Sequence, residues 1–493
     1  MSDKPRIRYN VHGQRVGTIR NSAFDAGSHG RRLKNWTPTS GGPNSVLFGS
    51  LETMRNRSRD AERNNGWISR GTDSWVTNEI GTGIVPRSRA SNEQFREQIT
   101  ALWKQWNKEA DADGMTTFYG LLAMAARTRF VSGECFIRRR MRNLSDDLVV
   151  PMQLQIMEPD LCPPETNGFE LQGGIEFDAI GRRRAYKMFR SHPGDIGMRT
   201  GLTTMVPADG VIHHYAPLRP GQIRGQPWTI QALLRAKDFD EYDDAERVRK
   251  KNKSAITGFI KRPEYTEDDY NYDPISGKPI HGDIGEAEST IEAGTFSQLL
   301  PGEDVEMASG DDAGQGYADY VKQQLLGKAA ALGVPFELMS WDMRGISDRM
   351  FRAVLNEFHR TLEQTQWMVT IPQICDRVWA WFVDAAVASG KIDAPDYAQN
   401  RRDYLRVEWQ PDAWPALHPV QDVEADKMAV RSGFMPRQEA VAKRGHDIAD
   451  VDEQMQEDQE RADSLGLWLD TDPRRTANSG SAHREPDPGE FDE

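Results

Sequence analysis

The sequence contains few cysteines and no long hydrophobic run. Only three of its 493 residues are cysteine, and Cys135, Cys162 and Cys375 lie far apart without a CxxC pair. Isolated cysteines of this kind are typical of small buried residues in a reducing compartment. The best candidate for a membrane span, VWAWFVDAAVA, is short and contains Asp384. Because a spanning helix needs about 20 apolar residues, we predict no membrane span. The charged N-terminal residues, MSDKPRIRYN, also lack the apolar segment of a secretory signal.

The motifs of common nucleotide-binding and hydrolytic enzymes are missing as well. No GxxxxGK[ST] loop occurs, because the Gly-Lys pairs at positions 327 and 390 lack the upstream glycine and the following Ser or Thr. The GTG at positions 81–83 lacks the third glycine of a dinucleotide site. GxSxG and HExxH are absent. We therefore predict that the protein is not an enzyme, and we expect no catalytic residue, cofactor or metal.

Two patterns keep an alternative open at this stage. His213 and His214 offer possible metal ligands, but neighbouring residues of a strand point to opposite faces, so an ordinary strand is the simpler interpretation. The acidic run at 238–246 offers carboxylates for a two-metal nuclease site. A solvated helix face or an interface between copies is the simpler interpretation of this run.

Charge is unevenly distributed along the chain. The net charge is −13, yet residues 1–60 carry 11 Lys and Arg against 4 Asp and Glu, which gives +7. Residues 451–493 carry 4 Arg against 13 acidic residues, which gives −9. This is not the uniformly basic charge of a protein that grips nucleic acid. We predict a basic, partly extended arm at 1–45 and a disordered acidic tail at 468–493.

The periodicity of the apolar residues predicts a helix-rich α+β protein. Met152, Leu154 and Ile156 alternate with glutamines, which indicates a strand. GIEFDAIGRRRAYKMF predicts a hairpin that turns near Gly181, MVPADGVIHHYAP predicts a short pair of strands, and DYLRVEWQ predicts one more strand. We predict helices at 46–82, 91–109, 115–128, 228–254 and 317–332, and three short helices at 419–432, 436–444 and 448–465.

The stretch at 317–390 organises the rest of the chain. Its first helix is expected to end at Gly333, which tolerates a left-handed backbone, and Pro335 prevents the helix from continuing. A loop at 334–346 follows, and Ser347 is a suitable N-cap for a second helix of about 40 residues.

Apolar residues recur at intervals of three and four along one face of this long helix. Pro372 removes one backbone donor and is expected to kink the helix near Met368. The predicted apolar face comprises Phe351, Val354, Leu355, Phe358, Leu362, Met368, Ile371, Ile374, Cys375, Val378, Phe382, Ala385 and Ala386.

Tryptophan is abundant, with 13 residues. Trp367, Trp379 and Trp381 lie on the long helix and are expected to pack in a core or an interface. Trp341 lies in the loop at 334–346, where an exposed tryptophan usually has a partner, and docking on a neighbouring helix is the alternative.

Several motifs, in this order and spacing, resemble the lambda-like family of tailed-phage portal proteins over about residues 22–467. They are GRRLKNW, LETMRNRSRDAERNN with NEIGTGI, MEPD, GIEFDAIGRRRAY, VPADGVIHHYAPLRPGQIRGQPW, LLPGEDVEM, LGVPFELM, and EWQPDAW with SGFMPRQEAVAKRGHDIADV. Members of the family often have a segment rich in Tyr, Asn and Ser where this chain reads SWDMRGISDRM.

The resemblance implies a homo-oligomeric ring, usually a dodecamer, at one capsid vertex of the virion, assembled in the host cytoplasm. Double-stranded DNA would enter and leave through it, and terminase, the major capsid protein and head-tail connector proteins would dock on it. The implied parts are a basic arm (1–45), a wing (46–227), stem helices (228–254 and 313–333), a small β-containing clip (255–312), a tunnel loop (334–346), a long kinked helix returning to the wing (347–414), a helical crown (415–467) and the tail (468–493).

The resemblance places the tunnel loop against DNA. The candidate DNA-facing residues are Trp341, Asp342, Met343, Arg344 and, at the start of the long helix, Arg349. The alternative for Arg344 is an ion pair with an acidic residue of a neighbouring subunit. The basic residues of the first stem helix are Arg247, Arg249, Lys250, Lys251 and Lys253, which suit the C-terminal end of a helix dipole.

Two other functions remain as alternatives to a portal. One is an enzyme of DNA packaging, such as a terminase or nuclease, against which the missing phosphate-binding loop argues. The other is a capsid or tail adaptor that is not a portal.

Overall fold

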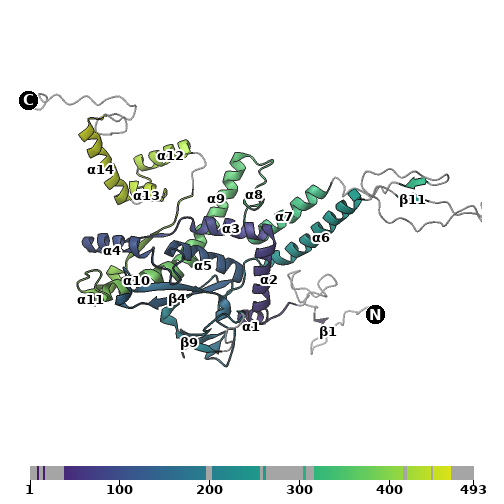
Figure 1. The fold of residues 1–493 in the computed structure, drawn as a ribbon, viewed down its shortest axis with the longest axis horizontal. Coiled ribbons are helices and arrows are strands. Elements are labelled where there is room, and N and C mark those ends of the chain that lie inside the picture. Colours follow the sequence, from purple (N-terminus) through teal and green to yellow (C-terminus); the bar gives the residue numbers. More distant parts are fainter. Residues whose placement is uncertain are drawn as a thin grey trace, which may run out of the picture.

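A computed structural model describes residues 38–195, 202–255, 316–414, 419–445 and 448–467, together with four short strands (Figure 1). Those strands form two antiparallel pairs, β1 (Arg8–Tyr9) with β2 (Arg15–Val16), and β11 (Phe259–Lys261) with β12 (Asp304–Glu306). Most of the expected arm, clip and acidic tail lies outside the described residues. Within them, no helix is both long and apolar enough to cross a membrane.

The N-terminal half begins with five helices that confirm the predicted helical stretches. Side-chain caps explain where three of them begin: Asn65 accepts hydrogen bonds from two backbone amides of α3, Asn92 caps α4 and Thr117 caps α5. The helices are α1 (Pro43–Phe48), α2 (Leu51–Asn64), α3 (Gly66–Ile80), α4 (Glu93–Trp106) and α5 (Phe118–Ser132).

Three antiparallel sheets accompany these helices. One has the order β10-β4-β5, the second β6-β7-β8-β9, and the third pairs β3 with β13. Short 3-10 turns lie between strands at Leu144–Asp146, Pro159–Leu161 and Ala208–Gly210. The strands are β3 (Val85–Ser88), β4 (Glu134–Met141), β5 (Met152–Met157), β6 (Leu171–Gln172), β7 (Ile175–Phe177), β8 (Arg183–Phe189), β9 (Thr203–Pro207), β10 (Val211–Tyr215) and β13 (Val407–Gln410).

The predicted hairpin is confirmed, whereas the predicted pairing of the next two strands is wrong. β7 pairs with β8, and Gly181 in their turn has a φ of 80°. The segment MVPADGVIHHYAP does form two strands, but β9 pairs with β8 while β10 pairs with β4. A 3-10 turn at Ala208–Gly210 separates β9 from β10, and the two strands enter different sheets.

Two helices leave this body side by side and run towards β11 (Figure 1). They are α6 (Ile230–Ala255) and α7 (Tyr317–Leu332). As predicted, α7 ends at Gly333, which has a φ of 69°. Arg235 of α6 lies across α7 at Gly327, where a side chain would collide with the guanidinium. The Trp228 indole, at the base of α6, donates to the Leu332 carbonyl oxygen at 2.9 Å.

The long helix is confirmed as one nearly continuous helical run with an irregular middle. It consists of α9 (Asp348–Thr365), the π-helical segment η7 (Gln366–Cys375) and α10 (Asp376–Ala388). Ser347 caps α9, as predicted, by accepting from the Met350 amide at 3.3 Å. Pro372 lies inside η7. Because a proline has no backbone N–H to donate, it interrupts the regular α-helical hydrogen bonding in this segment.

Within the π-helical segment the predicted apolar face is confirmed at Ile371, Ile374 and Cys375, which are buried, and it is wrong at Met368. Met368 is 70% exposed, whereas Gln366 and Thr370 are buried. A π-turn bonds residue i to i+5 and therefore shifts the face that looks inward. Two of the buried positions carry polar side chains: the Gln366 amide donates to the Glu79 carbonyl oxygen at 2.5 Å, and the Thr370 hydroxyl donates to a Glu79 carboxylate oxygen at 2.7 Å.

Four more helices follow the long helix in the described part of the chain. The first, α11 (Tyr397–Tyr404), was not predicted, whereas α12 (Pro419–Arg431), α13 (Arg437–Ala442) and α14 (Ile448–Leu465) confirm the three short helices. The last three lie at the end of the molecule opposite β11 (Figure 1). Among the described hydrophobic side chains of these three helices, only Ala462 is buried. Met435, in the turn between α12 and α13, is also buried. An ion pair between Arg352 of α9 and Asp422 of α12, at 2.6 Å, ties this group to the body.

Aromatic side chains form the centre of the two larger cores. In one, Trp103 and Trp106 of α4 surround Phe382 of α10, each with ring centroids 5.0 Å from the phenyl ring. In the other, Trp75 of α3 meets Phe358 of α9 at 6.1 Å, beside residues of α7. Trp379 and Trp381 are buried as expected, whereas Trp367 is 45% exposed.

The three cysteines are buried, as predicted. Burial raises the pKa of the Cys135 thiol to about 12, so this thiol stays protonated at neutral pH.

The joint between the sheets and α6 is a close crossing of two backbones. Gly133, with a φ of 89°, precedes β4, and an added Cβ would lie 2.4 Å from the Gln226 carbonyl carbon. A Cβ on Gly225 would lie 2.1 Å from the Gly133 oxygen. Glu134, the next residue, is completely buried and accepts from the Gly225 amide at 2.6 Å.

Candidate nucleic-acid interface

The loop at 334–346 lies at the end of α9 that is farthest from α10. Part of it is a short helix, α8 (Phe336–Ser340), which the sequence-based expectation of a plain loop missed. Pro335 provides the start of this helix, and the buried side chains of Phe336 and Met339 hold it against the body. The exposed part of the loop is therefore shorter than expected.

Helix α3 anchors the base of this loop. Arg70 Nε and the Ser74 hydroxyl both donate to the Leu338 carbonyl oxygen, at 3.3 and 3.2 Å. These bonds satisfy a carbonyl at the C-terminal end of α8, where no partner exists within the helix. Sequence reasoning missed Arg70, because its contact is 268 residues away along the chain.

Trp341 docks partly on the same arginine. The Arg70 guanidinium carbon lies 4.7 Å from the Trp341 ring centroid, within the range of a cation–π contact. Trp341 has a φ of 57° at the end of α8 and remains 64% exposed. One face of the indole is thus covered by α3, and most of the side chain is available to a partner.

Arg344 forms an ion pair inside the loop. Its Nε and Nη2 donate to the two carboxylate oxygens of Asp342, each at 2.8 Å, and the Arg344 backbone amide donates to Asp342 at 3.1 Å. These bonds to Arg344 hold the pKa of the Asp342 carboxyl well below its usual range. Arg344 therefore already has an acidic partner two residues away in the same loop.

The two members of this pair differ in exposure. The Arg344 side chain is 91% exposed and the Asp342 side chain 19%. Met343 between them is 39% exposed, and Gly345, with a φ of 79°, turns the backbone towards α9. Arg349 is exposed in the first turn of α9, without an ion-pair partner among the described residues. The apex of the loop therefore presents one cation that is paired internally, and the adjacent turn of α9 exposes Arg349 beside Asp348.

The basic residues near the end of α6 have local partners. Arg247 pairs with Asp243 and Asp244, Arg249 pairs with Glu246, and the Lys250 ammonium lies 4.4 Å from the Tyr317 ring centroid. Lys251 is exposed, and Lys253 lies in α6 beyond the described side chains. Much of this charge is neutralised within the helix pair.

The acidic run of α6 serves the packing of helices. The side-chain amide nitrogen of Asn65 donates to both carboxylate oxygens of Asp240, at 2.9 and 2.8 Å. Asp243 accepts from the Tyr317 hydroxyl at 2.8 Å. These contacts tie α6 to the start of α3 and to α7, which neither interpretation of the run anticipated. Asp238, Glu241 and Asp244 are exposed, as expected of a solvated helix face.

The two neighbouring histidines point to different environments. His213 Nε2 lies 2.8 Å from the buried Glu134 carboxylate, and His214 Nδ1 lies 2.9 Å from the Gln373 side-chain oxygen of η7. Arg55 and Arg224 also bond Glu134. Burial lowers the pKa of His213 to about 4. These contacts are those of buried strand residues.

Among the described residues, one group of three possible metal ligands occurs elsewhere: Glu158, Asp160 and His192. Arg59 already bonds Asp160 and lies 3.5 Å from Glu158, so a guanidinium provides the positive charge there.

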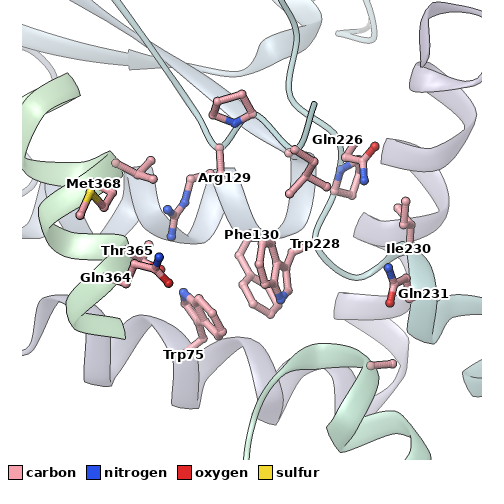
Figure 2. A pocket seen from close by; sticks show the side chains of 17 residues that line it. Trp75, Arg129, Phe130, Gln226, Trp228, Ile230, Gln231, Gln364, Thr365 and Met368 are labelled. Atoms are coloured by element: carbon pink, nitrogen blue, oxygen red, sulfur yellow. The ribbon is translucent and has the colours of Figure 1, made fainter. Parts of the chain in front are cut away.

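A cavity of about 420 Å³ lies where α3, α5, the base of α6 and the long helix meet. Figure 2 shows Met368, Thr365 and Gln364 on one side, Ile230 and Gln231 on the other, and aromatic rings between them. Its one titratable lining side chain, Arg129, bonds the buried Glu79 at 2.5 Å. The described lining of this cavity thus holds one guanidinium, which is already paired.

Comparison with known proteins agrees with the resemblance of the motifs. A family model described as "Phage portal protein, lambda family" matches residues 29–366. The "Probable portal protein" of Halomonas phage phiHAP-1 is 28% identical over 485 residues, covering 94% of this chain and 91% of the relative. "Portal protein B" of Escherichia phage lambda is 21% identical, covering 88% of each chain.

Solved structures similar to this chain come from gene transfer agents. A chain from the "Neck of native GTA particle computed with C12 symmetry" has a TM-score of 0.49 and 12% identity, covering 80% of this chain and 96% of the other. A chain from the neck of an empty particle, computed with C6 symmetry, has a TM-score of 0.47 and 14% identity, covering 83% of this chain and 95% of the other. The family match, from residue 29 to residue 366, extends over more than half of the sequence, and the chain therefore belongs to the lambda family of phage portal proteins.

Proposed function

We propose that the protein forms a homo-oligomeric ring, with twelve copies expected, at one vertex of a phage capsid. Double-stranded DNA passes through its channel during packaging and ejection. Membership of the portal family over residues 29–366 is the observation that carries this proposal. Terminase, the major capsid protein and head-tail connector proteins are the proposed partners, and assembly takes place in the host cytoplasm before the ring becomes part of the virion.

The resemblance to portal proteins implies the parts of the ring, and the arrangement of the elements supports the following assignment. We assign residues 46–227 to the wing, α6 and α7 to the stem, and 255–312, which includes the paired β11 and β12, to the clip. The long helix runs from the tunnel loop back into the wing, and α12–α14 form the crown. The protein acts as a conduit and docking platform rather than as an enzyme.

The loop at 334–346 faces the DNA in this arrangement. It presents the most exposed cation of the loop, Arg344, on a base that α3 fixes. A channel for moving DNA must hold it weakly, because each neutralised phosphate releases counterions and six to ten such contacts change affinity by roughly 10³–10⁵ across a modest salt range. A loop whose single cation is already paired with Asp342, followed by Arg349 in the first turn of α9, suits weak contacts at many registers.

Electron microscopy of the purified protein and Arg344→Ala together test this function. We expect channelled rings from wild-type and Arg344→Ala protein, and we expect Arg344→Ala particles to package or retain less full-length DNA. Arg360→Ala is the control, because Arg360 is an exposed cation on α9 outside the loop, and it should package normally. Normal packaging by Arg344→Ala particles would contradict the role of the loop.

Biochemical assays separate the portal from its alternatives. Pure protein should show neither ATPase nor nuclease activity, and activity that persists through purification would favour a packaging enzyme. A persistent monomer without rings would favour an adaptor.

A further inference from the structure

We propose that Asp342 occupies the place of a DNA phosphate on Arg344, and so lowers the affinity of the loop for the DNA that it touches. This inference rests on the proposed position of the loop in the channel. It assigns to Asp342 a role opposite to that of a DNA-binding residue. The carboxylate keeps the contact weak, and Arg344 supplies the attraction.

The geometry of the pair is that of a guanidinium binding a phosphate. Arg344 presents two parallel N–H groups to two oxygens at 2.8 Å each, which is the bidentate arrangement that arginine forms with carboxylates and phosphates alike. The edge of the guanidinium that would grip a phosphodiester through Nε and Nη2 is therefore already filled by an anion of the same chain.

The loop holds Asp342 in this position before any DNA arrives. The Asp342 amide donates to the Ser340 hydroxyl oxygen at 3.1 Å, and its carboxylate accepts the Arg344 backbone amide in addition to the side chain. The preceding residue, Trp341, is fixed by α8 and by its contact with Arg70. Asp342 is mostly covered while Arg344 is not, so DNA reaches the cation first.

A phosphate that approaches this pair can bind in two ways, and each gives a lower affinity than binding to an unpaired arginine. If it displaces Asp342, one bidentate bond pair replaces another, and the displaced carboxylate remains close to the DNA. If it binds the remaining edge of the guanidinium, two anions share one cation at short distance and repel each other. Either way the contact is an exchange with little net gain, which allows it to break as DNA advances.

The experiment compares duplex-DNA binding by assembled full-length rings across a salt series. Asp342→Asn removes the negative charge but keeps an oxygen that accepts the Arg344 amide. We expect affinity for a blunt duplex to rise severalfold, and the slope of log K against log salt to steepen by about 0.9 for each additional phosphate engaged. Glu357→Gln is the matched control, because it removes one exposed carboxylate paired with an arginine on α9 and should change affinity little.

A double-mutant cycle with Arg344→Gln isolates the pair. The gain from Asp342→Asn should disappear in the Arg344→Gln background. An equal gain there, or an equal gain from Glu357→Gln, would show an effect of net charge alone and would overturn the inference. If Arg344→Gln weakens binding while Asp342→Asn leaves it unchanged, the loop touches DNA but Asp342 does not mask it.

No effect of either substitution would remove the proposed DNA-facing role of the loop and the inference with it. Electron microscopy and thermal unfolding of each variant establish that the rings are intact. Asp342→Ser, which retains a small acceptor for the backbone amide, should reproduce the gain and provides a second test should Asp342→Asn fail to assemble.

Discussion

The two halves of the long helix are held in very different ways. In α10, seven of 13 residues are buried. Two of them, Phe382 and Trp379, pack against aromatic rings of α4. In α9, three of 18 residues are buried, in a single narrow stripe. The same rod is thus a core element at one end and a lightly held arm at the other. The exposed faces of α9 remain available to other copies.

The π-helical segment between the halves joins them through a buried carboxylate. Glu79 of α3 accepts from the Trp75 indole, Arg129 and Thr370, so its charge is compensated without water. Since buried charges must be paired and hydrogen-bonded, this network fixes the phase of the irregular turn. Substitutions in α10, in η7 and in α9 therefore show how the contribution to the free energy of unfolding falls along the long helix.

The largest effect is expected in α10. Phe382→Ala removes a fully buried ring from between two tryptophans and should reduce the free energy of unfolding by about 3–5 kcal/mol. Urea unfolding of the subunit, followed by tryptophan fluorescence, measures the loss. A loss below about 1 kcal/mol would mean that α10 is not the anchored half.

Phe358→Ala tests the buried stripe of α9. Phe358 is 4% exposed and packs against Trp75, so we expect a loss near the lower end of the same range of about 3–5 kcal/mol. Met350→Ala, at a position 62% exposed on the same helix, should change subunit stability by about 0.5 kcal/mol or less. If the two losses are equal, the register of α9 is wrong.

Thr370→Val addresses the junction between the halves. The substitution keeps the shape of the side chain and removes the hydroxyl that bonds Glu79, so a loss of about 1.5–3 kcal/mol is expected for a bond to a buried charge. Thr361→Val, whose hydroxyl bonds a carbonyl on the exposed side of α9, serves as the comparison. Equal losses of unfolding free energy in the two variants would mean that the bond to Glu79 does not stabilise η7.

The smallest effect is expected from deletion of residues 470–493, which lie outside the described part of the chain. Their composition, rich in Pro, Gly, Asp and Glu, cannot bury enough apolar surface to offset the entropy of ordering. Rings of the truncated protein should form as in the full chain when examined by electron microscopy. Failure to assemble would reveal an essential contact of the tail.

The sequence predicted local structure well because local signals decide it. Gly333 and Ser347 set the ends of α7 and α9 through backbone preference and capping, and the periodicity of Phe358 and Leu362 identified the buried stripe. Met368 was misplaced because a helical wheel assumes 3.6 residues per turn, whereas the π-turns at Pro372 have another period.

Contacts between distant segments were beyond the reach of the sequence. Arg70 anchors a carbonyl 268 residues away, and β9 and β10 separate into different sheets although they are neighbours in the chain. The Asp342–Arg344 pair, by contrast, has a local spacing that a search for i, i+2 ion pairs would have found.

The crossing of Gly133 and Gly225 has a mechanical consequence. Side chains are the soft part of a protein interior, since they change rotamer and yield to strain, but at this joint main chain touches main chain. A displacement or rotation of α6 is therefore expected to move the start of β4 directly. The adjacent bond from the Gly225 amide to Glu134 stiffens the joint further. We therefore expect α6 and the sheets to move as one rigid unit, and any residue larger than glycine at either position to push the two backbones apart.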